Sequence, residues 1–286
     1  MKTFSEHYKE SQNIYKKNEA TAAKVNLYNF TVREYNPPKS DDIIEIDDKM
    51  MSLINNISEV VKERFVDPKT HCWIPPHVDQ KNDILFRMKN VWDINAVEEL
   101  ASLITPQIEN NLFGSYSIVD GLYIYRSIFK ENASPRGSML WHFDNHIKER
   151  TKLLFYLNDV TEQNGPFEYM WNDEKKSALK AKTTKVDHTR WESYHSRVTE
   201  EEAAKFPIYG FFPKKMLGKM GTFAIFDNNI VHRACTPELG TYRDAFVLQL
   251  RPYHEKLRPH IDERWTGTNR HVDISTDPEN RKVHLK

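Results

Sequence analysis

The chain has little cysteine and no excess of charge of either sign. Its two cysteines, Cys72 and Cys235, are too few for a disulfide framework and lack the C-x-x-C spacing of redox and metal motifs. We therefore expect a protein of the reducing cytoplasm. The 41 basic and 41 acidic residues cancel, whereas proteins that bind nucleic acid or membrane surfaces usually carry a basic excess. This balance favours a small-molecule partner.

Long apolar runs and the common nucleophile motifs are also missing. No stretch approaches the roughly 18 consecutive apolar residues that a membrane span needs. The polar N-terminus, Met1 to Glu19, lacks the apolar core of a signal peptide. The sequence contains no Gly-x-Ser-x-Gly, P-loop or Rossmann fingerprint. These absences exclude several large classes of hydrolase and nucleotide-binding protein.

Two segments of the N-terminal part show helical periodicity. A helix is expected from Asp41-Asp42 to about Arg64 and another from about Asn95 to Asn111. The apolar residues of the first helix recur at helical spacing: Ile44, Met51, Ile54, Ile57 and Val61. Residues 1–113 as a whole are expected to form a polar arm and two helices that need another layer to cover their apolar faces.

From residue 115 the pattern changes to that of strands, with β-branched and aromatic residues throughout. Strands are expected at 115–129 (broken by Gly121), 140–143, 152–157, 221–226 and 245–251. Residues 171–205 read as a polar insertion that can form helix, and 253–286 as a charged tail. We therefore expect one domain of 286 residues, mainly β with flanking α, whose β core spans 115–252.

One motif suggests a metal site, but it occurs four times. A His-x-Asp pair on a strand directs both side chains to one side, and two histidines with one carboxylate bind iron(II) while leaving coordination positions open. Only one copy ends an apolar strand and precedes another. The four copies are His77/Asp79, His142/Asp144, His260/Asp262 and His271/Asp273, and the context favours the second. The other three are expected to be surface pairs or turns.

A third ligand and an anion-binding arginine follow in the expected order. His232 comes after the strand that ends at Asp227, and Arg243 precedes the apolar run that begins at Ala245. A turn at Pro237 to Gly240 allows the two flanking strands to lie side by side. Arginine suits a dicarboxylate because its guanidinium forms two parallel, charge-assisted hydrogen bonds with one carboxylate. The alternative is a core histidine and a surface arginine.

The stretches that carry these residues resemble the phytanoyl-CoA dioxygenase-like family of iron/2-oxoglutarate oxygenases. The matching segments are Leu140 to Asp144, Lys152 to Val160, Asn164 to Phe167 and Gly221 to Pro252, within residues 115–252. The resemblance implies a double-stranded β-helix (jelly-roll, cupin-like) core with iron(II), 2-oxoglutarate and O₂ as cofactor and cosubstrates. It also implies that His142, Asp144 and His232 bind iron and that Arg243 binds the far carboxylate of 2-oxoglutarate.

The sequence departs from that family at one point. Many relatives have Gly-Ser-His after the Asn-Gly-Pro-Phe segment, whereas Met170 to Glu174 stand here. The usual lid and the substrate class therefore do not carry over. Asp144 is informative as well, because related halogenases have a small residue there that admits a halide. The carboxylate favours hydroxylation of an unactivated C–H bond.

Several further residues are weaker candidates for the site. Lys152 could meet a cosubstrate carboxylate or could be an exposed strand lysine, and Trp141 could line the site or pack in the core. Arg126 and Tyr125 could face the cavity. The insertion could supply a substrate lid through His188, Arg190, Trp191 and His195, or it could be a solvated helical flap. The expected substrate is a small or carrier-linked molecule. The rival interpretations are a divalent-metal hydrolase or isomerase and a metal-free binding module.

Overall fold

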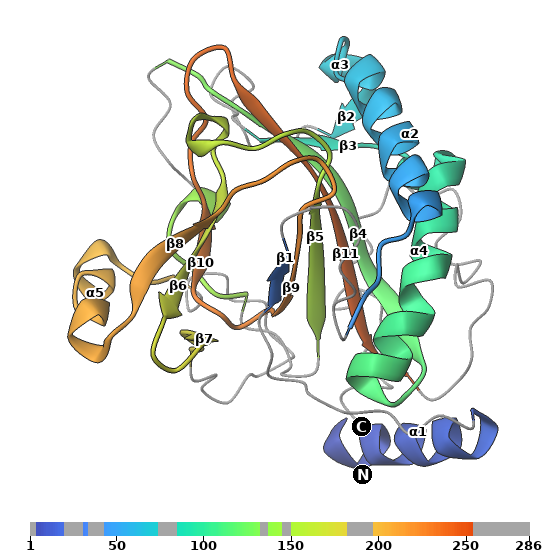
Figure 1. Ribbon diagram of the computed structural model, residues 1–286. Coiled ribbons are helices and arrows are strands. Elements are labelled where there is room, and N and C mark those ends of the chain that lie inside the picture. The colour runs from blue at the N-terminus through green and yellow to red at the C-terminus, as the bar shows by residue number, and fades with distance from the viewer. Residues whose placement is uncertain are drawn as a thin grey trace.

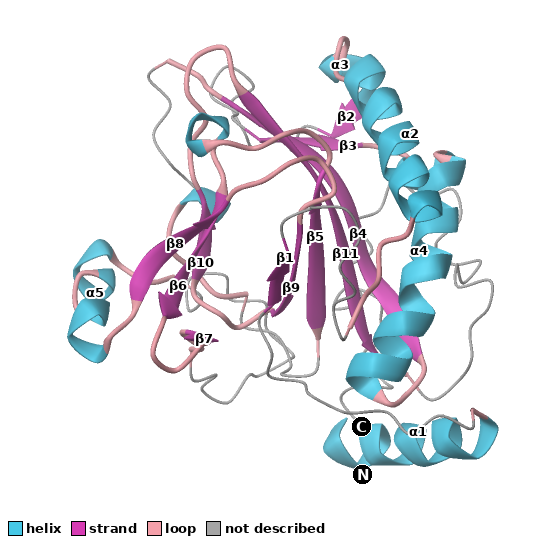
Figure 2. Cartoon of the chain, viewed as in Figure 1, coloured by secondary structure: helices cyan, strands magenta, loops and turns pink. Residues whose placement is uncertain are grey.

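The computed structural model describes residues 4–19, 31–33, 43–73, 85–131, 137–144, 150–181 and 197–253. They form two antiparallel β-sheets that face each other, with a pair of helices covering the outside of the larger sheet (Figures 1 and 2). The expectation of a mainly β chain with flanking helices is confirmed for the described residues.

Seven strands form the larger sheet, in the order β1-β9-β5-β11-β4-β3-β2. Every neighbouring pair in this order is antiparallel. The strands are β1 (Thr31–Arg33), β2 (Cys72–Trp73), β3 (Leu85–Met88), β4 (Ser117–Ile128), β5 (Thr151–Tyr156), β9 (Phe223–Asp227) and β11 (Tyr242–Pro252). The long central pair β4 and β11 contains a register shift between Gln249 and Leu250, opposite the expected break at Gly121.

The smaller sheet is built around β6, which pairs with each of the other three strands. Its strands are β6 (Phe167–Asn172), β7 (Ser177–Ala178), β8 (Phe212–Met216) and β10 (His232–Ala234). Short helical turns connect the strands. The 3₁₀ turns are Val91–Asp93, Gly137–Met139, Glu162–Asn164 and Phe206–Tyr209, and a π turn spans Glu109–Phe113.

Helices α2 (Asp48–Arg64) and α4 (Asn95–Ile108) lie side by side against the larger sheet (Figure 1). Asp47 caps α2 by accepting a hydrogen bond from the backbone N–H of Met50, which satisfies one of the unpaired donors at a helix N-terminus. The remaining helices are α1 (Phe4–Asn18), α3 (Pro68–His71) and α5 (Glu200–Ala203).

Alternation along the strands divides the core into two apolar layers. On β5, Leu153 and Phe155 pack with the helices, whereas Leu154 and Tyr156 pack with the smaller sheet. Strand β11 alternates in the same way between its even-numbered and odd-numbered residues. Since successive side chains on a strand point to opposite faces, the odd-numbered positions of β11 and the even-numbered positions of β5 point into the space between the sheets.

Several boundaries differ from expectation. The first expected helix begins at Asp48 rather than at Asp41, because Asp47 supplies the cap. Residues 140–143 form no strand, and only His142 makes bridges there. The N-terminal part contains the additional helix α1 and the short strands β1, β2 and β3.

The insertion 171–205 is less helical than expected. Its described parts hold the end of β6, strand β7 and the single-turn helix α5, while 182–196 lie outside the described residues. No helix in the described part of the chain is both long enough and apolar enough to cross a membrane.

Replacing Ile57 by alanine tests the packing of α2 against the sheet. Ile57 is fully buried, so we expect Ile57→Ala to lower the free energy of unfolding by about 2–5 kcal/mol through lost burial and the cavity left behind. Urea unfolding followed by circular dichroism measures this change. Asn56→Ala, at an exposed position of the same helix, is the matched control, and equal losses in the two variants would contradict the packing described here.

Candidate metal centre

Two backbone hydrogen bonds hold His142 next to His232. The N–H of His142 donates to the carbonyl of His232 at 3.0 Å, and the N–H of His232 donates back to the carbonyl of His142 at 2.9 Å. Residues paired in this antiparallel way project their side chains from the same face. The two imidazole rings accordingly lie with their centroids 4.3 Å apart.

Each imidazole is oriented by a carbonyl of its own segment. Nδ1 of His142 donates to the carbonyl of Leu140, and Nδ1 of His232 donates to the carbonyl of Ile230, both at 2.8 Å. A proton on Nδ1 leaves the lone pair of the neutral ring on Nε2. Both histidines therefore present Nε2 as a metal ligand, with the partner on the other nitrogen that metal-bound histidines usually have.

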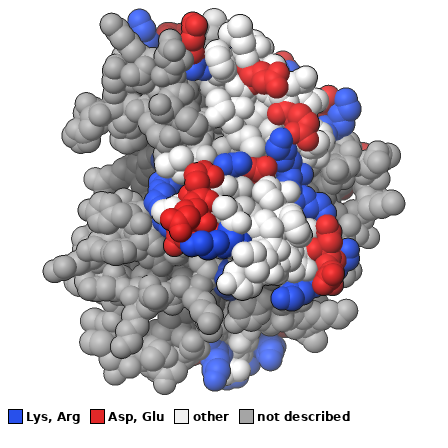
Figure 3. Space-filling view, turned by 90° about the vertical axis from the view of Figure 1, so that its left-hand side faces the viewer, with Lys and Arg blue, Asp and Glu red and all other residues white. Residues whose placement is uncertain are grey.

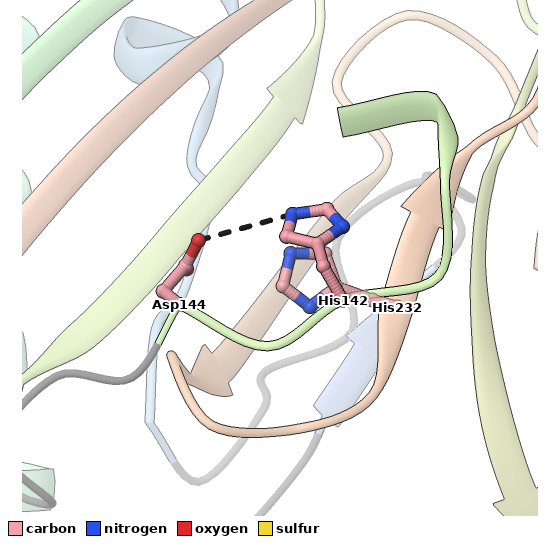
Figure 4. A group of neighbouring side chains, drawn as sticks. All are labelled: His142, Asp144 and His232. Atoms are coloured by element: carbon pink, nitrogen blue, oxygen red, sulfur yellow. Dashed lines mark ion pairs between the residues drawn. The ribbon is translucent and has the colours of Figure 1, made fainter. Parts of the chain in front are cut away.

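Asp144 completes a group of three ligands. Its backbone N–H donates to the carbonyl of Asn228 at 2.8 Å, and its Oδ1 lies 3.9 Å from Nε2 of His142. Figure 4 shows the three side chains converging, and one ligand atom from each lies within 4.8 Å of the others. Among the described residues this is the only group of three His, Cys, Asp or Glu side chains so placed. Two imidazoles and one carboxylate are the donor set that suits iron(II).

The other carboxylate oxygen of Asp144 is held by Lys152. Nζ of Lys152 forms an ion pair with Oδ2 of Asp144, and the lysine side chain is only 15% exposed. Lys152 is thus a neighbour of the predicted metal ligand rather than the exposed strand lysine of the alternative interpretation. Because Oδ2 is engaged by the lysine, Oδ1 is the oxygen left to face the two histidines.

Burial keeps both histidines neutral. It lowers the pKa of His232 to about 3 and also lowers the pKa of His142 below its usual value, because loss of water disfavours the imidazolium form. The nearby carboxylate of Asp144 opposes this effect in both cases. A metal ion competes with protons for the same nitrogens, so lowered pKa values leave these nitrogens available at neutral pH.

Arg243 is a fully buried cation on the inner side of β11. Its Nη2 lies 3.4 Å from the hydroxyl oxygen of Ser127, and the Tyr125 ring centroid is 5.7 Å from its guanidinium carbon. Among the described residues, neither Nε nor Nη1 of Arg243 has a hydrogen-bond partner. A buried charge without a counter-charge is costly, and the unfilled donors of a guanidinium can hydrogen-bond a carboxylate.

The acid next to Arg243 in the sequence cannot neutralise it. Asp244 points to the helix side of the sheet and accepts two hydrogen bonds of 2.7 Å from Arg126, from Nε and from Nη2. The Arg126 guanidinium also stacks over the ring of Phe65 at the end of α2. Arg126 therefore lies on the face away from the metal centre, while Tyr125, the other candidate from β4, lies on the inner face near Arg243.

Of the two tryptophan candidates, the structure describes only Trp141. Trp141 is buried in an apolar cluster with Met170, Ala203 and Val231, and the guanidinium of Arg233 covers its ring at 4.3 Å. Of the two alternatives for Trp141, lining the site or packing in the core, the structure shows packing in the core. Trp191 and its neighbours His188, Arg190 and His195 lie outside the described residues, as do the other three His-x-Asp pairs.

Two residues near the centre were not expected from the sequence. Arg197 pairs with His142 in a second antiparallel bridge. Asn228, whose carbonyl holds Asp144, is fully buried, and neither polar atom of its amide has a hydrogen-bond partner among the described residues. No local pattern singles out either residue, because each is placed by pairing between distant segments.

Comparison with solved structures identifies the fold. SnoK, a non-heme alpha-ketoglutarate-dependent carbocyclase from nogalamycin biosynthesis, superposes with a TM-score of 0.52 at 13% identity, over 85% of this chain and 84% of SnoK. The epimerase SnoN, solved with Fe³⁺, alpha-ketoglutarate and nogalamycin RO, gives 0.51 at 11% identity, over 86% and 83%. EctD from S. alaskensis, solved with 2-oxoglutarate and 5-hydroxyectoine, gives 0.50 at 15% identity, over 83% and 77%.

Sequence comparisons give no such relatives. No family model matches the chain, and no curated protein matches it. At 11–15% identity the three structures establish a shared fold. SnoN was solved with Fe³⁺ and alpha-ketoglutarate and EctD with 2-oxoglutarate, and SnoK is an alpha-ketoglutarate-dependent enzyme. The resemblance to the phytanoyl-CoA dioxygenase-like family in particular stays a prediction.

The lowered histidine pKa values predict how acid affects the metal-free protein. Since the unfolded chain binds a proton near pH 6.5 and buried His232 does not, the free energy of unfolding should fall as the pH drops below about 6.5, by about 1.4 kcal/mol per pH unit for each such histidine. Urea unfolding between pH 7 and 5 with a chelator measures this slope. In the His232→Gln variant, the slope of the free energy of unfolding against pH should be smaller by the contribution of about one proton. An unchanged slope would contradict a buried neutral His232.

Proposed function

We propose that this protein is an iron(II)- and 2-oxoglutarate-dependent oxygenase that hydroxylates an unactivated C–H bond of a small-molecule or carrier-linked substrate. The proposed scaffold is a double-stranded β-helix, in which the two facing sheets enclose the metal centre. His142, Asp144 and His232 are the proposed iron ligands, and Arg243 is the proposed partner of the far carboxylate of 2-oxoglutarate.

The observation that carries the proposal is the buried guanidinium of Arg243 on the same inner side as the ligand group. A metal hydrolase or isomerase would use the three ligands but would leave this arginine without a role. A metal-free binding module would explain neither the three ligands nor the arginine. A dicarboxylate explains both features, because one end can bind the metal and the other can accept hydrogen bonds from the unfilled donors of Arg243. Solved neighbours of the same fold that contain iron or 2-oxoglutarate support this assignment.

The residues of this chain contribute binding, orientation and exclusion of water. When bound, iron(II) would couple the oxidative decarboxylation of 2-oxoglutarate by O₂, which gives succinate and CO₂, to oxidation of the substrate. The backbone pairing of His142 with His232 fixes two ligands, and Lys152 keeps Asp144 to one ligating oxygen. Tyr156 is fully buried near Arg243 and donates to the carbonyl of Met216 at 2.8 Å, which holds its neutral hydroxyl in place.

Hydroxylation is preferred to halogenation because Asp144 fills the position that a halide would take. The solved neighbours include an epimerase and a carbocyclase, so the fold hosts more than one outcome. Hydroxylation is the simplest of them, since it needs no second protein group to redirect the oxidised substrate.

The described surface fits a small-molecule partner better than nucleic acid. On the face that carries β8 and α5, basic and acidic side chains lie intermixed around a patch of uncharged residues, and neither sign of charge dominates the described residues of this face (Figure 3). Both cysteines are free thiols, which supports a cytoplasmic location as part of the same proposal.

Anaerobic addition of iron(II) and 2-oxoglutarate tests the assignment. A weak visible charge-transfer band should appear, and succinate should form in air. His142→Ala should abolish the band and the succinate, because a ligand is lost, whereas His77→Ala, in another of the four His-x-Asp pairs, should leave both. Absence of the band together with absence of succinate would refute the oxygenase.

The Arg243→Met variant separately tests the proposed contact between Arg243 and 2-oxoglutarate. Loss of a buried, charge-assisted contact costs about 2–5 kcal/mol, so the Kd for 2-oxoglutarate should rise about 30-fold or more. Equilibrium dialysis should show iron(II) affinity within about threefold of the parent protein, because Arg243 is not a metal ligand. Unchanged 2-oxoglutarate affinity would assign that carboxylate to another residue.

A further inference from the structure

A row of paired residues extends from the smaller sheet across the metal centre. Tyr169 pairs with His232, His232 pairs with His142, and His142 pairs with Arg197, in each case antiparallel. The N–H of Val198 donates to the carbonyl of Trp141 at 3.0 Å, which fixes the last segment. Because directly opposed residues share a face, the side chain of Arg197 starts from the same face as the two histidines.

Arg197 is the solvent-facing member of this row. The residue is exposed, whereas His142 and His232 are buried. Its positive charge acts on Asp144 and on His142, and partial burial lowers the pKa of its guanidinium without removing that charge. Arg197 therefore stands beside the metal ligands and is itself exposed to solvent.

Lys152 is a second cation at the same carboxylate, reached from the opposite sheet. It lies on β5, forms its ion pair with Asp144 and also acts electrostatically on both histidines. Its cross-strand neighbours on either side are Phe226 and Gln249. One carboxylate thus faces two cations, one on β5 and one on the segment that bridges to His142.

Binding of the metal and cosubstrate changes the balance of charge around Asp144, Lys152 and Arg197. A divalent ion is neutralised by Asp144 together with the near carboxylate of 2-oxoglutarate, and the far carboxylate offsets Arg243. The negative charge that faces Lys152 and Arg197 in the protein alone is then shared with the metal. The next acid nearby among the described residues, Asp227, already pairs with Lys180. The loaded centre is therefore flanked by two positive charges.

We propose that the substrate carries an anionic group, a carboxylate or a phosphate, which binds between Arg197 and Lys152 beside the metal centre. This inference rests on the proposed function, since it concerns the centre loaded with metal and 2-oxoglutarate. A guanidinium offers paired donors to either anion, and an ammonium adds a point charge. The anionic group would thereby anchor the substrate beside the metal.

Matched small probes test this without knowledge of the substrate. The protein is loaded with zinc(II), a diamagnetic substitute for iron(II), and saturated with 2-oxoglutarate. Saturation-transfer NMR then measures the Kd of benzoate against benzamide and of phenyl phosphate against phenol. At least one anion should bind about tenfold or more tightly than its neutral counterpart, and the better pair distinguishes a carboxylate from a phosphate substrate.

Four variants locate the effect. Arg197→Gln and Lys152→Met should each reduce the preference for the anion to below about threefold. Arg64→Gln, whose guanidinium binds backbone carbonyls after β3, and Lys219→Met, an exposed lysine paired with Asp159, are the matched controls and should leave it unchanged. Equal binding of anion and neutral probe, no binding of any probe, or a preference that survives Arg197→Gln would overturn the inference.

The two proposals fail in different ways. Equilibrium dialysis of zinc(II) and 2-oxoglutarate on every variant reports whether the centre is loaded. Failure of the parent protein to bind 2-oxoglutarate would contradict the proposed function. Normal loading without any preference for anions would contradict only the anionic substrate.

Discussion

The two backbone hydrogen bonds between His142 and His232 are the constraint on which the metal centre depends. They join segments far apart in the sequence, set both imidazoles on one face and bring Asp144 beside the turn that contains Asn228. The same pairing continues to Arg197, so one row of backbone contacts places two ligands and a cation. A carbonyl at Nδ1 of each ring then turns Nε2 toward the common point.

The larger sheet supplies the opposite wall through simple alternation. Positions on β5 and β11 that point away from the helices carry Lys152 and Arg243 among apolar neighbours such as Leu154 and Val247. Alternation also sends Asp244 to the other side, where Arg126 neutralises it. Among the described residues, Arg243 therefore keeps its buried positive charge on the inner face, apart from the Asp244 carboxylate that follows it in the sequence.

Local sequence patterns predicted the elements whose periodicity is strong. Helices α2 and α4 and strands β4, β5, β9 and β11 lie near the expected ranges, because each buries a continuous apolar face. The patterns failed where tertiary pairing decides. Leu140–Phe143 was expected as a strand but makes only two isolated bridges, both at His142. An exposed position was one of the two alternatives for Lys152, but its ion pair with Asp144 leaves the side chain only 15% exposed. Arg197 gave no signal, since its place depends on which distant segment lies beside His142.

A crystal structure of the protein with iron(II) and 2-oxoglutarate, grown without oxygen, tests the central claim most directly. The account predicts one metal ion bonded to Nε2 of His142, Nε2 of His232 and one oxygen of Asp144, with 2-oxoglutarate reaching from the metal to the guanidinium of Arg243. A metal bound elsewhere, or 2-oxoglutarate that makes no contact with Arg243, would contradict it.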